Sequence, residues 1–299
     1  MNHRKHRNKP PASPPEADER WLRAVLRPLV SVLSLGAVLA GAAYGLEQLK
    51  NRLYALPEYN PPINFELAQL EDVPWVEKEG WRPRILHSIH LPANRGGSES
   101  ELLENIARQL EASGWVSRVR RVWKETHGTI RLACEYRRPI AMLETSGGRY
   151  IPVDKDGVRL PEVYDRVPSE LGWMRIVGVQ SEIPEVGTPF RGSAGDAVAA
   201  VRLAALLFDQ PQIGPQISRI DVSNFDGRRD RRENHIRLWT RDGRRIDWGS
   251  AIGREMEEAT VEQKLRNLVL LLKNESAQAR ADISTYPNTV RVYWDEQGR

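Results

Sequence analysis

The chain has 299 residues, a net charge of +4 and one cysteine, Cys134. A single cysteine excludes an intrachain disulfide and a zinc site built from several thiolates. The first 27 residues carry seven basic and three acidic side chains, so the positive charge lies in this tail and the remainder is neutral. The charge balance therefore gives no reason to expect a nucleic-acid partner.

Residues 1–27 form a basic, proline-rich tail. Pro10, Pro11, Pro14 and Pro15 fall close together, and apolar side chains are scarce before Trp21. Such a segment cannot bury enough apolar surface to fold alone. The sequence predicts a disordered, cytoplasmic tail over residues 1–27.

Residues 28–46 are nineteen consecutive residues without a charge. As a helix they would be roughly 28 Å long, close to the ~30 Å hydrocarbon core of a bilayer. Because basic residues beside a span stay in the cytoplasm, we predict a single-pass protein of the cell inner membrane with extracytoplasmic C-terminal domains. The alternative is a cleaved secretory signal, since Ala40, Gly41 and Ala42 match the A-x-A cleavage pattern. The uncharged run continues past this triplet, which favours a retained anchor.

Residues 47–83 are expected to connect the span to the folded part. The helix of the span is expected to continue through Leu53, because the prolines that follow cannot extend it. The stretch 72–83 contains Trp75 and Trp81 but has no clear hydrophobic period, so it predicts no element.

Residues 84–137 have the order strand, helix, strand, strand. Even steps between apolar residues favour a strand over residues 84–91. Ser98 and Glu101 match a capping box that begins an amphipathic helix. Two further strands are predicted over residues 115–123 and 129–137.

Residues 138–299 form a larger, β-rich region. Glycine-containing turns predict two hairpins, and two segments with apolar residues at helical spacing predict two helices. The predicted strands cover residues 140–144, 149–153, 171–179, 217–222, 236–240, 244–248, 281–284 and 289–294. The predicted helices cover residues 193–208 and 257–273. The fold class expected for the chain is α+β.

Four patterns that can indicate a chemical site are interpreted as structural. His87 and His90 would lie on opposite faces of a strand, which is a poor arrangement for one metal. Residues 154–157 are expected to form a turn rather than a calcium loop, and Cys134 a buried thiol rather than a nucleophile. The basic run 228–232 is expected to be a solvated loop. We predict no catalytic, cofactor-binding or metal-binding residue.

In layout and in several motifs the chain resembles the FtsQ/DivIB family of bacterial cell-division proteins. The similar stretches are residues 115–122 with 130–132, 138–141 with 150–158, 264–268 and 282–287. The resemblance implies a POTRA-like βαββ domain over residues 84–137. It also implies an FtsQ-like β domain, a mixed sheet with packed helices, over residues 138–299. Only one clear helix is predicted in the first domain, where the family has two.

The resemblance implies a non-enzymatic scaffold at the division site that binds FtsB- and FtsL-like single-span coiled-coil proteins. In this family the last strand is the docking edge, where a partner strand pairs with free N–H and C=O groups. The residues implied in partner binding are Tyr286, Thr289, Val290, Arg291, Val292, Tyr293 and Trp294. Tyr286 and Trp294 would be the aromatic anchors. The alternative is a plain edge strand with Val290, Val292 and Trp294 in the core.

Two other functions stay open on the sequence. The chain could be a POTRA-bearing envelope assembly or secretion factor, although it has only one β domain after the POTRA-like part. It could also be a membrane-anchored envelope hydrolase whose paired carboxylates come from distant parts of the chain.

Overall fold

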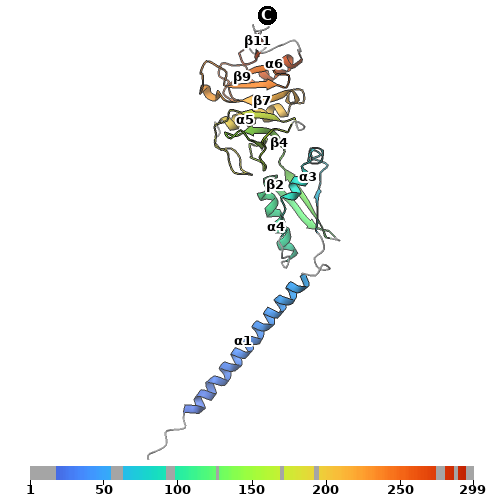
Figure 1. The fold of residues 1–299 in the computed structure, drawn as a ribbon, viewed down its shortest axis with the longest axis vertical. Helices are drawn as coiled ribbons and strands as arrows, with labels where there is room; N and C mark the ends of the chain where they lie inside the picture. Colours follow the sequence, from blue (N-terminus) through green and yellow to red (C-terminus); the bar gives the residue numbers. More distant parts are fainter. Residues whose placement is uncertain are drawn as a thin grey trace, which may run out of the picture. The chain divides into compact units, whose positions relative to one another are not determined.

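The computed structural model describes residues 18–54, 63–91, 98–125, 128–168, 172–191, 195–273, 280–285 and 289–293. The chain is a mixed α+β protein, as predicted, with one apolar N-terminal helix and two β-sheets (Figure 1). It divides into two compact units. The first contains helix α1, and the second contains both sheets.

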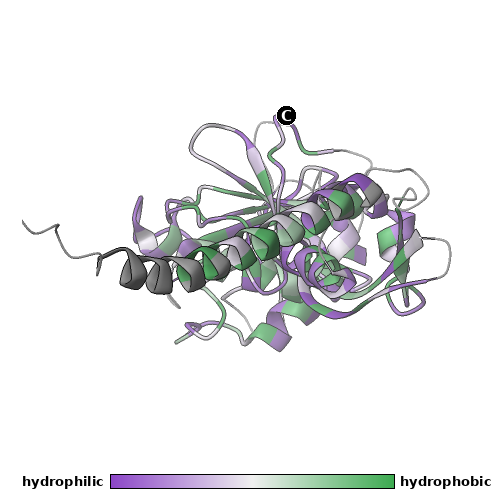
Figure 2. Cartoon of the chain, turned by 90° about the horizontal axis from the view of Figure 1, so that it is seen from below, coloured by the Kyte–Doolittle hydropathy of each residue, from purple (hydrophilic) through white to green (hydrophobic). Residues whose placement is uncertain are grey.

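Helix α1 covers Asp18–Tyr54 and is the one helix of the described residues that is long and apolar enough to cross a membrane. Its most apolar window is Val32–Leu49, with a mean hydropathy of 1.4, and Figure 2 shows the hydrophobic turns along it. The helix continues past Leu53, as predicted. It also begins at Asp18, so the last ten residues of the tail predicted to be disordered are helical. These residues follow the prolines and are mostly good helix formers.

The first sheet has three strands in the order β1-β3-β2. The predicted hairpin is present as β2 (Val116–Lys124) and β3 (Thr129–Tyr136), which are antiparallel. Strand β1 (Asn64–Ala68) lies parallel to β3. Because β1 falls in the segment predicted to be a connector, this part of the fold begins near residue 63 and not at residue 84.

The described residues between β1 and β2 form three helices: α2 (Trp75–Lys78), α3 (Arg82–His87) and α4 (Glu99–Ala112). The strand predicted over residues 84–91 is wrong, since α3 occupies the first half of this stretch and no strand follows in the second half. Ile85 and Ile89 are four residues apart, a spacing that fits one face of a helix as well as an even-numbered strand pattern. The capping box of α4 is confirmed, with the Glu101 amide 3.2 Å from the Ser98 hydroxyl and the Ser98 amide 3.0 Å from the Glu101 carboxylate.

The second sheet has eight strands in the order β11-β10-β9-β8-β7-β6-β4-β5. Its strands are β4 (Pro139–Glu144), β5 (Tyr150–Asp154), β6 (Met174–Val177), β7 (Ile217–Asp221), β8 (Ile236–Thr240), β9 (Arg245–Gly249), β10 (Arg280–Asp282) and β11 (Arg291–Tyr293). Both predicted hairpins, β4–β5 and β8–β9, are confirmed. Gly148 and Gly243 turn them with φ values of 73° and 91°, which other residues rarely adopt.

Helices α5 (Asp196–Phe208) and α6 (Val261–Lys273) supply the cover for one face of this sheet, near the predicted positions. Alternate residues of the strands join them in one buried core. Its members include Ile176, Ile220, Leu238, Ile246, Ala200, Leu203 and Leu268. The short helices η3 (Gly214–Gln216) and η4 (Phe225–Gly227) flank β7. The strand residues between the core positions therefore point to the opposite face of the sheet.

A second core joins the two sheets inside the second unit. Met142 of β4 and Trp173 are buried together with residues of the small sheet and its helices. Trp81 stacks on Trp173, with ring centroids 5.5 Å apart, and lies 4.9 Å from Trp115. The sequence of residues 72–83 predicted no secondary-structure element, yet this segment contributes the Trp81 side chain to the core.

Candidate docking edge

Strand β11 is the last strand of the large sheet and pairs with β10 alone among the described strands. It covers Arg291–Tyr293, within the predicted strand over 289–294. Tyr286 and Trp294, the predicted aromatic anchors, lie outside the described residues. The edge position expected for this segment is therefore present, in a strand of only three described residues.

The side chains of this segment alternate between the core and solvent. Val290 packs partly against the core of the large sheet, and Val292 is half-buried. Thr289, Arg291 and Tyr293 are exposed. Val290 and Val292 thus lie on the core-facing side, and Thr289, Arg291 and Tyr293 lie on the other side. The strand is anchored by its valines and leaves its polar and aromatic side chains accessible.

No described strand pairs with the outer side of β11 at Val292. Ile283 donates its N–H to the carbonyl of Asp247 on β9, at 3.2 Å. Because backbone groups of successive strand residues point to opposite sides, those of Asp282 point toward β11. Arg291 is the register partner of Asp282, so its N–H and C=O point back to β10. Those of Val292 therefore point away from the sheet, where a further strand would pair.

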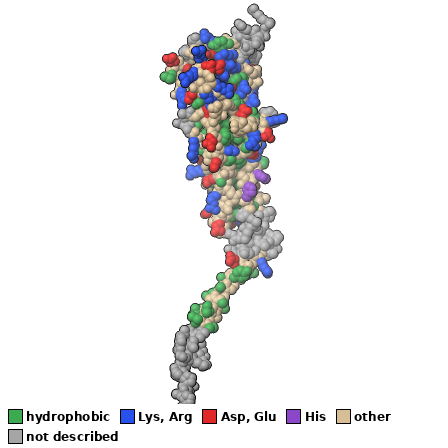
Figure 3. Space-filling view, turned by 60° about the vertical axis from the view of Figure 1, so that its left-hand side comes forward, with side chains coloured by type: hydrophobic (Ala, Val, Ile, Leu, Met, Phe, Trp, Pro, Cys, Tyr) green, Lys and Arg blue, Asp and Glu red, His purple; other side chains and the backbone are tan. Residues whose placement is uncertain are grey.

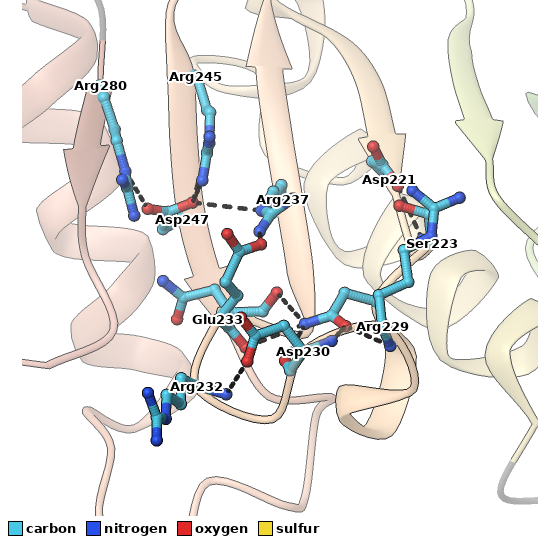
Figure 4. Close-up of polar contacts among 12 residues, drawn as sticks. Asp221, Ser223, Arg229, Asp230, Arg232, Glu233, Arg237, Arg245, Asp247 and Arg280 are labelled. Carbon is cyan, nitrogen blue, oxygen red and sulfur yellow. Dashed lines mark hydrogen bonds and ion pairs between the residues drawn. The ribbon is translucent and has the colours of Figure 1, made fainter.

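A buried carboxylate holds β10 in place under this edge (Figure 4). The side chain of Asp247 on β9 is fully buried and receives Arg280 of β10 at 2.7 Å and Arg245 at 3.1 Å. Arg237 of β8 lies 3.8 Å away and also pairs with Glu233. One carboxylate therefore links three neighbouring strands through ion pairs.

Residues 228–232 lie in the loop before β8 and are all exposed, as the solvated loop predicted for them requires, and several contacts hold this loop. Arg228 pairs with the buried carboxylate of Asp196, at 2.6 Å, and donates to the carbonyl oxygens of Ser223 and Val222. The Asn224 side chain accepts from the amides of Arg229 and Asp230, both at 2.9 Å. The contact of Arg228 with Asp196 was not predicted, because the two residues are 32 positions apart in the chain.

The other candidate chemical residues have structural surroundings. His87 ends α3, and the ring of His90 lies 3.1 Å from the carbonyl of Ser88. Within the described parts of the chain, no group of three or more His, Cys, Asp or Glu side chains is placed to hold a metal ion. Burial raises the pKa of the Cys134 thiol to about 12, which disfavours the nucleophilic thiolate.

The predicted turn at residues 154–157 is confirmed. Asp154 accepts from the amides of Asp156, at 3.0 Å, and Val158, at 2.8 Å. Its carboxylate also pairs with Arg137, 2.7 Å away. Asp154 thus closes the turn and ties it to the end of β3.

The Asp247 network was missed by sequence reasoning. Arg237, Arg245 and Asp247 occupy strand positions that alternate with apolar residues, and this shows only that they leave the core. Which strands become neighbours decides their partners, and β10 reaches β9 from more than thirty residues along the chain. The alternation was visible in the sequence, but the network depends on strand order.

Two comparisons with known proteins identify no relative of this chain. A scan against models of protein families finds no match, and a search of curated proteins finds none either. The resemblance to the FtsQ/DivIB family therefore stays a prediction from the sequence motifs, to be weighed with the geometry of the edge strand.

Proposed function

We propose that this chain is a non-enzymatic scaffold of the bacterial cell-division machinery, similar to the FtsQ/DivIB proteins. It is anchored in the cell inner membrane by α1 with its N-terminus in the cytoplasm. Its extracytoplasmic part binds FtsB- and FtsL-like single-span coiled-coil proteins at the division site. A partner strand pairs with β11.

The open edge at β11 is the observation that carries the proposal. The strand ends an eight-stranded sheet, and the backbone groups of Val292 point outward. Unpaired N–H and C=O groups in a row are the template for strand addition. Arg291 and Tyr293 stand exposed on the same strand, where they supply contacts for a partner side chain.

The topology of the small sheet adds support for a POTRA-like part. Its chain order is one strand, helices and then two strands, with β3 in the middle of the sheet. The additional strand β1 and helix α3 supply elements that the sequence motifs lacked. With β1 and α3, the order of strands and helices in this part of the chain is closer to the two-helix arrangement of the family.

Replacement of Val292 by proline tests the docking edge directly. Proline removes the outward N–H but leaves the backbone groups of Arg291 and Tyr293 that face β10. We expect co-expressed FtsB-like partner to be lost when the V292P protein is purified from membranes. Val292→Ala is the matched control, because it removes the same side chain and keeps the N–H, and it should retain the partner.

Thermal unfolding separates this result from a folding defect. The V292P and V292A proteins should unfold at closely similar temperatures, since both keep the pairing of β11 with β10. Equal partner recovery with both variants would show that β11 is not the docking edge. A large drop in unfolding temperature for both variants would show that the Val292 side chain belongs to the folded core instead.

A further inference from the structure

One row of side chains crosses the face of the large sheet opposite α5 and α6. Residues in register on neighbouring strands lie side by side on the same face. The row runs from β6 to β11 through Arg175, Arg219, Trp239, Arg245, Arg280 and Tyr293. Four of its six members are arginines. Figure 3 shows Lys and Arg side chains among Asp and Glu over the part of the molecule that carries this sheet.

The two ends of the row differ in how their charge is balanced. Near β9 and β10, Asp247 pairs with Arg245 and Arg280. Near β6 and β7, no carboxylate of the described residues lies within ion-pair distance of Arg175 or Arg219. These two arginines are direct cross-strand neighbours, an arrangement in which like charges repel. The β6–β7 end therefore carries uncompensated positive charge.

Trp239 provides an apolar platform beside this charge. The Arg219 guanidinium lies 3.8 Å from the centroid of the Trp239 ring, which is a stacking distance. The Arg219 Nε is buried and has no acceptor within the described structure. The guanidinium is thus held over the ring.

A cleft of about 400 Å³ opens next to Arg175. Arg166, Arg175 and Arg241 line it, and Asp165 is the one carboxylate among the described lining residues. Arg241 is fixed in place, because its Nε donates to the carbonyl of Pro215 at 2.6 Å and its Nη2 to that of Gly172. The remaining wall is given by Gly148, Tyr150, Val167, Pro168, Gly172, Trp173 and Ser218. The cleft has a rigid wall and an excess of guanidinium groups.

We propose that this arginine face, defined by Arg166, Arg175, Arg219, Trp239 and Arg241, binds an extended, carboxylate-rich segment of a partner protein. Guanidinium groups match carboxylates with two parallel hydrogen bonds, and stacked arginines lose little further freedom on binding. The same row already binds a carboxylate at its other end, where Asp247 occupies the arginines.

The arginine face is separate from the β11 edge. Five strand spacings, roughly 24 Å, separate β6 from β11. A partner on the arginine face therefore leaves β11 open for strand addition. The inference does not rest on the proposed division function, and either can fail without the other.

A defined peptide tests the inference on the intact chain in a neutral detergent. The probe is a fluorescein-labelled peptide of alternating Glu and Thr, about eight residues long, enough to span the arginine face when extended. Its partner probe has Gln in place of Glu. We expect the Glu peptide to raise fluorescence anisotropy on binding and the Gln peptide to bind at least about tenfold more weakly. Binding should weaken as salt rises.

The double variant Arg175→Glu with Arg219→Glu should lose binding of the Glu peptide by at least about tenfold. Arg202→Glu is the matched control, because Arg202 is an exposed arginine on α5. It should bind as the unchanged protein does. Thermal unfolding checks that the double variant is folded. If it is not folded, the double variant Arg175→Ala with Arg219→Ala removes the two positive charges without adding negative ones.

Three results would overturn the inference. Equal affinity for the Glu and Gln peptides would exclude recognition of carboxylates. Unchanged Glu-peptide binding by both double variants would place the site elsewhere. Failure to bind the peptide, together with binding to phosphatidylglycerol vesicles that the double variants lose, would assign the surface to the membrane instead.

Discussion

The Nε of Arg280 on β10 lies 2.7 Å from the carboxylate of Asp247 on β9. This pair is a main polar tie of β10, which has only three strand residues and in turn supports β11. The charge that Asp247 brings into the sheet is balanced from three strands at once. The position of the edge strand β11 therefore depends on a carboxylate two strands away.

Asp247→Asn should destabilise the sheet and weaken binding at the edge. The change leaves Arg237, Arg245 and Arg280 without their shared anion, and loss of one buried partner of an ion pair is costly. We expect the free energy of unfolding to fall by about 2–3 kcal/mol. This is less than breaking a fully buried ion pair usually costs, because the arginines are partly exposed. Urea unfolding of the intact chain in detergent measures it.

Glu233→Gln is the control for this prediction. Glu233 pairs with Arg237 but its side chain is 52 % exposed, so solvent screens the pair. Loss of such a pair costs about 1 kcal/mol or less. A larger loss for E233Q than for D247N would contradict the central place of Asp247.

Asp196→Asn should remove an acid-sensitive part of the stability. Burial raises the pKa of Asp196, but hydrogen bonds from Ser181, Arg228 and the amide of Gln180 outweigh it and hold the pKa below its ordinary value of 3.8. A carboxyl with a lowered pKa in the folded state stabilises the protein above pH 3.8, and this contribution is lost as the pH falls below that value.

Urea midpoints measured between neutral pH and acid pH test this difference. The unchanged protein should lose more stability below pH 3.8 than D196N does. Ser181→Ala removes one donor and keeps the carboxylate, so it should show an intermediate dependence. Parallel curves for all three proteins would show that Asp196 is not a determinant of acid stability.

The Cys134 thiol should be slow to react in the folded protein and should weaken the fold in alkali. Burial raises its pKa from the ordinary 9.0 to about 12, so the thiolate fraction at pH 8 falls on the order of a thousandfold. Between these two values the unfolded chain ionises first, which makes stability fall as pH rises. Iodoacetamide labelling with and without urea measures the reactivity.

Cys134→Ala provides the alkaline comparison. Its stability should fall less than that of the unchanged protein between pH 9 and 12, because the variant has no thiol to ionise. Labelling of the native protein at the rate of the unfolded one would contradict the burial of the thiol.

The N-terminal helix makes a prediction about the mature chain. If α1 is a retained anchor, protein extracted from membranes has an intact mass that includes Met1 or begins at residue 2. A mass that begins near Ala43 would show a cleaved signal. Replacing Ala40 and Ala42 with Leu leaves a retained anchor unchanged and would abolish such cleavage.

Local signals were enough to predict most of the elements. The capping box at Ser98 and the turn glycines Gly148 and Gly243 mark backbone positions with few alternatives, and all three were interpreted correctly. The helices α5 and α6 followed from apolar spacing. These signals act over a few residues, which is the range that a sequence pattern can report.

The elements that were missed depend on distant partners. Strand β1 has five residues and becomes a strand by pairing with β3. The residues of helix α3 have an apolar pattern that fits a helix and a strand equally well. Burial of Ile85 in the same core as the tryptophans favours the helix. The arginine face and the Asp247 network depend in the same way on strand order. The edge position of the last strand was predicted only because the family resemblance implied it.

The pairing of β1 with β3 also sets an order of events during synthesis. Asn64 is in register with Thr129, so about 65 residues must leave the ribosome after β1 before its partner exists. At translation rates of about 5–20 residues per second, β1 waits for several seconds. The β2–β3 hairpin completes locally, and β1 then adds to a preformed edge. The nascent chain must keep this short strand unpaired until the hairpin emerges.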